Sequence, residues 1–167
     1  MIAAVAEPMF TETLQISIVV RDLEATMKTY VEAYGIGPWD IYEFNPGTVA
    51  NMTRDGAPSE YAIRLALTMV GSVQWELVEP LDELSIYAEF LAQKGEGVHH
   101  VAVGGRSYQE EMSAMRAAGR TSIQGGIYNG VTFDYLSTDE DLGVITEIFD
   151  WPVGLVQEPD ATYPPAS

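Results

Sequence analysis

The sequence predicts an α+β fold made of two similar modules, each of which begins with a strand and a helix and ends with a strand that carries one inward-facing glutamate. The first observation is an internal repeat. The segment LQISIVVRDLEATMKTYVEA aligns with HHVAVGGRSYQEEMSAMRAA at an offset of 85 residues, which superposes Gln15 on His100. A second pair of segments, VQWELVEP around Glu76 and VITEIFDWP around Glu147, has an offset of 71 residues. The smaller offset indicates shorter loops in the second module.

Hydrophobic patterns predict the elements of the first module in order. Residues 14–20 alternate as a strand does, and Asp22 is a suitable N-cap for a helix that runs to about Tyr34 and stops at Gly35. Residues 51–59 are expected to form a polar loop. Three further strands are expected at residues 39–44, 61–70 and 73–79.

The same reasoning predicts the rest of the chain. A linker helix is expected at about residues 84–94, followed by a strand at 98–103 and a helix at 108–118. The tail from Pro152 has turn and polyproline composition. Three strands at 122–127, 131–136 and 144–149, with an acidic turn at 138–141, are expected in between. The predicted division is a lead-in at 1–12, a first module at 13–82, a linker helix at 83–95, a second module at 96–151 and a C-terminal tail at 152–167.

Composition argues against several classes of function. The chain has 25 acidic and 8 basic side chains, a formal net charge of −17, so nucleic acid and anionic membranes are unsuitable partners. We find neither an apolar run of the ~20 residues that cross a bilayer nor a signal peptide pattern, so a cytoplasmic location is expected. The lack of cysteine excludes disulfides, thiolate metal sites and a cysteine nucleophile. The acidic surface is interpreted as solubilising, with attraction of a cationic ligand as the alternative.

The strongest candidate for chemistry is His100. It is one of only two histidines and lies at the head of an apolar strand. A histidine there can be a metal ligand, a base, or a buried residue that only satisfies a hydrogen bond. Its partner in the repeat, Gln15, together with Glu76 and Glu147 inside apolar runs, favours the ligand interpretation. The neighbouring His99 is expected to point to the opposite face and to be structural.

Two glutamates that face one another across a cleft repel, and each tends to take up a proton. A divalent cation between them would remove that repulsion, and an amide oxygen and an imidazole would complete a mixed nitrogen and oxygen shell. Such a shell suits zinc, nickel, cobalt, manganese or iron better than calcium. Ser17 and Ala102 lie two residues beyond Gln15 and His100, and their small size would leave space for a ligand beside the ion.

The segments ELVEPL and SIYAEFLAQKGEGVHHVAV are the most specific parts of a resemblance that runs from Leu14 to Asp150. They resemble the corresponding segments of methylmalonyl-CoA epimerases. The chain as a whole is similar to the vicinal oxygen chelate superfamily, which includes glyoxalase I, extradiol dioxygenases and bleomycin-resistance proteins. The resemblance implies a glyoxalase-like fold, in which two βαβββ modules form a cupped mixed and antiparallel sheet around a central cleft. It also implies a divalent metal, held by the first and last strands of each module.

By this resemblance the metal ligands are Gln15, Glu76, His100 and Glu147. Gln15 stands where the epimerases usually have histidine, whereas a set of Gln, Glu, His and Glu is similar to the zinc ligands of eukaryotic glyoxalase I. The set differs from the triad of two histidines and one carboxylate in non-haem iron oxygenases, which argues against dioxygenase chemistry.

The implied activity is metal-dependent enolate stabilisation with proton transfer next to a carbonyl, as in an isomerase, an epimerase or a lyase. Glu147 is the expected base as well as a ligand, and Glu60 is the second candidate. The expected partners are a small carbonyl substrate and a second copy of the chain in a homodimer. The epimerases imply a CoA thioester, with Arg54 and Arg64 as candidates for its phosphates. The alternative function is metal-free sequestration of a small aromatic or cationic molecule, as in bleomycin-resistance proteins.

Overall fold

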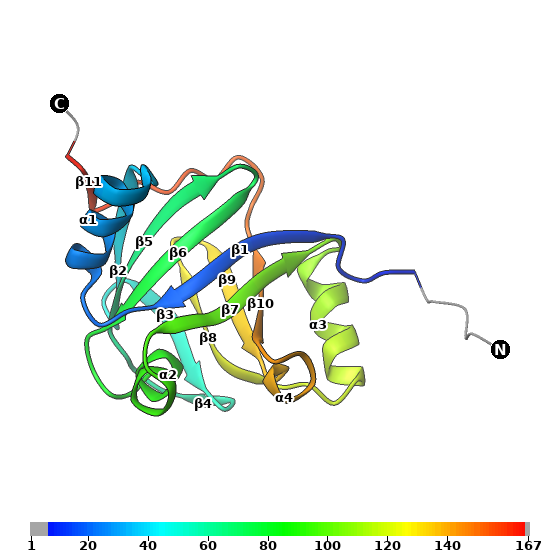
Figure 1. The fold of residues 1–167 in the computed structure, drawn as a ribbon. Coiled ribbons are helices and arrows are strands. Elements are labelled where there is room, and N and C mark those ends of the chain that lie inside the picture. The colour runs from blue at the N-terminus through cyan, green and yellow to red at the C-terminus, as the bar shows by residue number, and fades with distance from the viewer. Residues whose placement is uncertain (1–6, 166–167) are drawn as a thin grey trace.

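One eleven-stranded sheet is the framework of the protein, which a computed structural model describes over residues 7–165 (Figure 1). The strands lie in the order β11–β2–β5–β6–β1–β7–β10–β9–β8–β3–β4. Their bounds are β1 Glu12–Val19, β2 Trp39–Phe44, β3 Val49–Arg54, β4 Ala57–Pro58, β5 Ile63–Val70, β6 Val73–Pro80, β7 Gly97–Gly104, β8 Ser122–Tyr128, β9 Val131–Leu136, β10 Ile145–Asp150 and β11 Ala161–Tyr163. The helices in this part of the chain are α1 Leu23–Tyr34, α2 Ile86–Lys94, α3 Tyr108–Ala117 and α4 Asp139–Leu142.

Each half of this sheet contains four strands of one predicted module, and β3 and β4 of the first module extend the half of the second. The strands of the first module lie in the order β2–β5–β6–β1, and those of the second lie in the mirrored order β7–β10–β9–β8. In each module the first and last strands are parallel neighbours, β1 with β6 and β7 with β10. The modules join where β1 pairs antiparallel with β7. The predicted α+β class and the paired βαβββ modules are therefore confirmed.

Helices α1 and α3 each cover one face of their own module. Met27 of α1 belongs to a buried cluster with Leu77 of β6, and Met112 of α3 belongs to one with Ile148 of β10. A third buried cluster, rich in tyrosine, includes residues of both modules and of α2. Because side chains alternate along a strand, the residues that flank Leu77 and Ile148 face this third cluster, on the inner side of the curved sheet.

Helix caps agree with the local sequence. The Asp22 side chain accepts a hydrogen bond from the amide of Ala25 at 2.9 Å, and Gly35 ends α1 in the left-handed conformation, with φ of 67°. Ser85 and Ser107 cap α2 and α3 in the same way. Within residues 7–165, no helix has the length and apolar character that crossing a membrane requires.

The predicted polar loop at 51–59 is wrong, because this segment contains β4 and most of β3. Strand β3 pairs antiparallel with β8 of the second module, and β4 pairs back onto β3. The pairing with β8 is irregular around Asn51, whose φ is 52°. Buried Val49 and Met52 are therefore three residues apart, which conceals the two-residue period of a strand. Pairing with the edge of β8, and not a local sequence pattern, therefore determines the conformation of β3.

Two short elements were also absent from the prediction. The expected acidic turn contains α4, whose three acidic residues lie in its first turn, where the helix dipole favours negative charge. The C-terminal tail contains β11, which pairs with β2 of the first module, with Ala161 opposite Ile41. A three-residue strand has too few side chains for a detectable pattern, so its backbone partner on β2 determines it.

Candidate functional site

The register of four adjacent central strands brings the predicted ligands together. Ser17 of β1 pairs with both Glu76 of β6 and His100 of β7. In the neighbouring row, Gln15 of β1 and Glu147 of β10 both pair with the alanine two residues after His100. The four predicted ligands therefore surround two small side chains on the inner face of the sheet.

Three of these side chains meet at one point. The Nε2 atom of His100 lies 3.2 Å from Oε2 of Glu76 and 3.3 Å from Oε2 of Glu147. The imidazole is fully buried, and the side chains of both glutamates are 7% exposed. Gln15 is also buried, and its side-chain amide donates a hydrogen bond of 2.7 Å to Oε1 of Gln74. The three side chains that meet come from positions up to 71 residues apart in the sequence.

The three groups are electrostatically linked. Burial lowers the pKa of His100, but hydrogen bonds and charge from Glu147 and Glu76 outweigh burial and raise this pKa to about 9. Burial raises the pKa of Glu147, and the imidazole partly offsets that effect. With no other cation present, the imidazolium is therefore the charge that balances the two carboxylates.

The prediction that His99 points away from His100 is wrong. Strand β7 has a register shift, in which His100 pairs with Ser17 and Val98 pairs with Ile18, so His99 is the extra residue of a bulge. The two imidazole rings lie edge to face with their Nδ1 atoms 2.9 Å apart, and one Nδ1–H donates to the other nitrogen.

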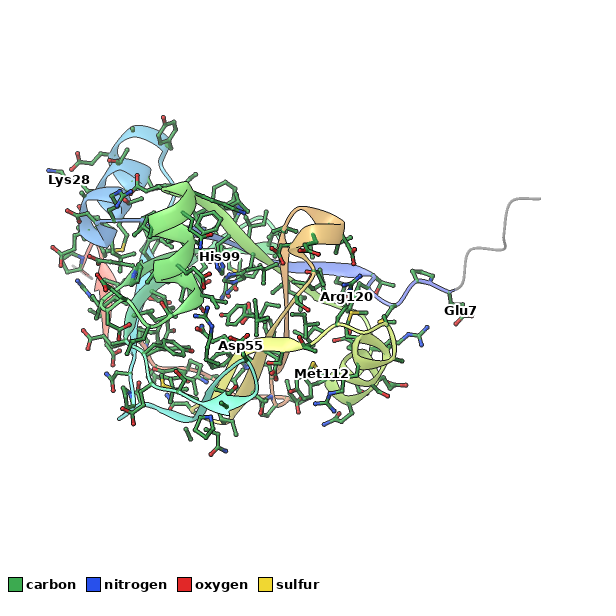
Figure 2. The ribbon with its side chains drawn as sticks, turned by 90° about the horizontal axis from the view of Figure 1, so that it is seen from below. Glu7, Lys28, Asp55, His99, Met112 and Arg120 are labelled. Carbon is green, nitrogen blue, oxygen red and sulfur yellow. The ribbon has the colours of Figure 1, made fainter. Side chains whose placement is uncertain are left out.

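His99 remains a buried residue of the interior, against α2. Its ring contacts Tyr87 and Phe90 of that helix, and Figure 2 shows it directed into the molecule. Burial, with a smaller contribution from His100, lowers the pKa of His99 to about 2. A neutral His99 can accept the Nδ1–H of His100, which leaves Nε2 of His100 facing the carboxylates.

Sequence reasoning missed the tyrosines behind the site. Tyr87 of α2 donates a hydrogen bond of 2.5 Å to the hydroxyl of Tyr135 on β9, and a hydrogen bond from Tyr135 lowers the pKa of Glu147. Tyr61, just before β5, has a buried hydroxyl without a hydrogen-bond partner among residues 7–165. Nearby Glu147 and Glu76 add to the effect of burial in raising the pKa of Tyr61. In the sequence these tyrosines are visible only as aromatic residues, and packing in a core explains such residues equally well.

The site lies at the inner end of a cavity with about 570 Å³ of empty space, including the open solvent at its mouth. Gln15, Glu76 and Glu147 line this cavity, and His100 lies behind them. Most of the remaining wall is apolar and aromatic and comes from both modules. A ligand in the cavity would therefore meet two carboxylates and an amide at its inner end and hydrocarbon along its sides.

Three other predicted residues lie away from this cavity. Glu60 is exposed beside a separate surface depression, so the structure does not bring it to Glu147. Arg54 forms ion pairs with Glu89 and Asp55. Arg64 forms ion pairs with two other glutamates, one on α1 and one on β2. Neither arginine lines the cavity.

The chemistry of the four ligands fits a divalent ion. Within residues 7–165, no group of three or more His, Asp or Glu side chains is arranged to hold a metal ion, and the carboxylates of Glu76 and Glu147 contact the imidazole of His100 directly. Beyond these contacts, Nε2 of His100 and both Oε2 atoms are buried and have no hydrogen-bond partner there. Buried polar atoms rarely stay unsatisfied, so a further group that binds all three would complete the site.

Comparison with known proteins identifies the family. A family model described as the Glyoxalase/Bleomycin resistance protein/Dioxygenase superfamily matches residues 14–135. The chain belongs to this superfamily. Another protein similar to it is the uncharacterised protein YqjC of Bacillus subtilis (strain 168), which is 33% identical over 94 residues. That match spans 53% of the chain and 66% of YqjC, just under two thirds of its length.

Solved structures of methylmalonyl-CoA epimerases have the same superfamily fold. The epimerase of Streptomyces coelicolor, in complex with 2-nitronate-propionyl-CoA, is 25% identical, with a TM-score of 0.68 over 89% of this chain and 99% of that one. The epimerase of Mycobacterium tuberculosis is 22% identical, with a TM-score of 0.66 over 90% and 95% of the two chains. These likenesses confirm the resemblance found in the sequence and support an enzyme family of the epimerase or isomerase type.

Proposed function

We propose that this protein is a metal-dependent enzyme that moves a proton at the carbon next to a carbonyl group. Gln15, Glu76, His100 and Glu147 would hold the metal ion, with zinc, nickel, cobalt, manganese or iron as the candidates. The observation that carries the proposal is the meeting of three buried, otherwise unpartnered atoms at the inner end of a cavity. When bound, such an ion supplies a Lewis acid that stabilises developing negative charge on a carbonyl oxygen.

The residues of the chain would supply the proton transfer. Glu147 lines the cavity, so its carboxylate can reach a carbon atom of a bound ligand and accept its proton. The hydroxyl of Tyr135, which accepts a hydrogen bond from Tyr87, lowers the pKa of Glu147 and would help to orient its carboxylate. The side chains of Glu147 and Glu76 are only 7% exposed, which limits the access of water to this point. Epimerisation, isomerisation and elimination share this first step, and the fold of the epimerases supports the first two.

Metal analysis tests the proposed ligands. We expect close to one divalent ion per chain after reconstitution and buffer exchange, and a loss of most of it in Glu76→Gln, because an amide is a weaker ligand than a carboxylate. Glu60→Gln is the matched control and should keep the ion, since Glu60 is exposed and lines a different depression. A wild-type protein that retains no ion from any of the five metals would contradict the proposal.

His99 is expected to position the ligand imidazole. Replacing it with phenylalanine removes the acceptor for Nδ1–H of His100, and loss of such a partner typically weakens metal binding by about 10–100-fold. His99→Asn places an amide oxygen near the position of Nδ1 and should restore most of the affinity. Competition with a chromophoric chelator measures both variants. Equal affinity of His99→Phe and the wild type would show that the contact between the two rings has no such role.

A second candidate function follows from the walls of the cavity. Aromatic side chains around two buried carboxylates also suit a cationic aromatic molecule, which a metal-free protein of the bleomycin-resistance type would sequester. Absence of bound metal, together with tight binding of a cationic aromatic dye, would favour this function. The expected homodimer and cytoplasmic location stay predictions.

A further inference from the structure

The cavity is built to receive an apolar, flat group. Phe44 stacks on Tyr128 with their ring centroids 4.2 Å apart, and Phe133 lies 5.8 Å from Phe44. Leu65 and Phe149 line the same space from opposite halves of the sheet. Such walls gain free energy by removing hydrocarbon or aromatic surface from water, and they offer nothing to an anionic group.

The charges around the cavity exclude an anion. Among the described residues that line it, none is lysine or arginine, and the only charged ones are Glu76 and Glu147. Two carboxylates balance the formal charge of one divalent ion, so the loaded site has no net positive charge with which to attract an anionic substrate. The net charge of −17 adds a further repulsion at long range.

The two arginines that the sequence offered for phosphate binding are already engaged elsewhere. Each forms ion pairs with two carboxylates, Arg54 with Asp55 and Glu89 and Arg64 with two glutamates on neighbouring elements. A CoA thioester carries several phosphate charges, which need free cationic groups beside the mouth of the cavity. The chain does not present Arg54 or Arg64 in that position.

The segment that joins β10 to β11, Trp151 and the first part of the C-terminal tail, lines one side of the cavity with neutral groups. It runs to β11 on the far edge of the sheet, as Figure 1 shows. Trp151 and Gln157 are its two residues in the cavity wall. The indole donates to the carbonyl of Leu155 at 2.9 Å, and Asn129 donates to Gln157 at 3.1 Å. This segment therefore adds one aromatic wall and one amide, and no charge.

We infer that the substrate is an uncharged carbonyl compound with a flat, apolar body, and that anionic acids and CoA thioesters are excluded. The inference rests on the proposed function for the position of the carbonyl group, at the end of the cavity beside Glu147. The substrate class itself follows from the aromatic walls and from the lack of any cationic side chain on them. Burying an ionised carboxylate or phosphate along those walls has no compensating partner.

A pair of probes that differ in charge and by one methyl group tests this inference. Methyl phenylpyruvate and phenylpyruvate share one aromatic ketone body, and methylmalonyl-CoA is the third probe. With metal-reconstituted protein, calorimetry should show the ester binding at least roughly tenfold more tightly than the acid, since an unpaired buried charge costs more than the ~1.4 kcal/mol that a factor of ten represents. Tighter binding of phenylpyruvate or methylmalonyl-CoA than of the ester overturns the inference.

Two variants locate the preference in the cavity. Leu67 lines the wall and is half-buried, so Leu67→Arg should place a cation there and move the ratio of affinities towards phenylpyruvate by about tenfold. Trp151→Ala should weaken binding of the ester, whereas Val153→Ala, fully exposed in the same segment, should not. An unchanged ratio in Leu67→Arg would show that the probes bind elsewhere and would contradict the inference.

The same probes separate this inference from the proposed function. NMR measures deuterium exchange at the carbon next to the ketone. An exchange rate above the uncatalysed rate reports proton transfer by the protein. Metal-dependent exchange that is faster for phenylpyruvate or the thioester than for the ester overturns the substrate class alone. Preferential binding of the ester without metal or exchange overturns the proposed function and leaves the substrate class supported.

Discussion

Replacing Glu147 with glutamine is expected to slow metal-dependent proton exchange next to the carbonyl by about 10²–10⁴-fold, the usual contribution of a positioned general base. The carboxylate lines the cavity and contacts Nε2 of His100 at 3.3 Å. Glu147 and Glu76 are the two charged residues of the cavity wall, and each has a carboxylate that can accept a proton. Glutamine has nearly the same volume and no basic oxygen. The measurement is the rate of loss of the substrate proton signal in D₂O.

Bound metal measured on the same Glu147→Gln sample distinguishes the two roles of the residue. Loss of exchange with retention of the ion assigns Glu147 the role of base, and loss of both assigns it a ligand role as well. Glu60→Gln controls for the substitution itself and should exchange at the wild-type rate, because Glu60 is exposed on a different surface. Exchange by Glu147→Gln within threefold of the wild type would remove Glu147 from the mechanism.

Replacing His100 with leucine is expected to destabilise the metal-free protein by about 3–5 kcal/mol, the cost of removing one member of a buried ion pair. The imidazole is fully buried between the carboxylates of Glu76 and Glu147, and neighbouring charge keeps it protonated. Leucine fills a similar space but leaves two buried carboxylates without a positive partner. Urea unfolding in the presence of a chelator measures the free energy of unfolding.

The matched control removes the charges together. The triple variant Glu76→Gln, His100→Leu and Glu147→Gln should recover most of the lost free energy of unfolding, because neutral amides replace the uncompensated carboxylates. Its recovery would assign the loss to electrostatics rather than to packing. A His100→Leu protein as stable as the wild type would show that the three groups are not a balanced charge cluster.

The predicted ligands could be found from the sequence because each lies in an apolar strand at corresponding positions of a repeat. Alternation along a strand determines which side chains share a face, and the parallel pairing of first and last strands then aligns Glu76 with Ser17 and Glu147 with the second module's alanine. Local pattern and tertiary pairing agree at these positions. The position of Glu60, exposed beside a separate depression, could not be located in this way, because a carboxylate beside a loop has no periodicity.

The partners of the site could not be found in this way. His99 faces the interior because a bulge in β7 breaks the alternation, and the sequence GVHHVAV contains no sign of it. Tyr87 reaches Tyr135 from the linker helix, 48 residues away, so only the packing of α2 against both modules brings the hydroxyls together. The pairing of β3 with β8 likewise depends on a strand edge in the other module.

By itself, the sequence determined the α+β class, the duplication, the strand positions of Gln15, Glu76, His100 and Glu147, and the acidic character that disfavours anionic partners, since these depend on periodicity and composition. The tertiary structure decided what surrounds those residues: the bulge at His99, the tyrosines behind the carboxylates, and the neutral aromatic walls of the cavity. The physical reason is that burial and hydrogen bonding depend on contacts between distant segments, whose register a local pattern does not encode.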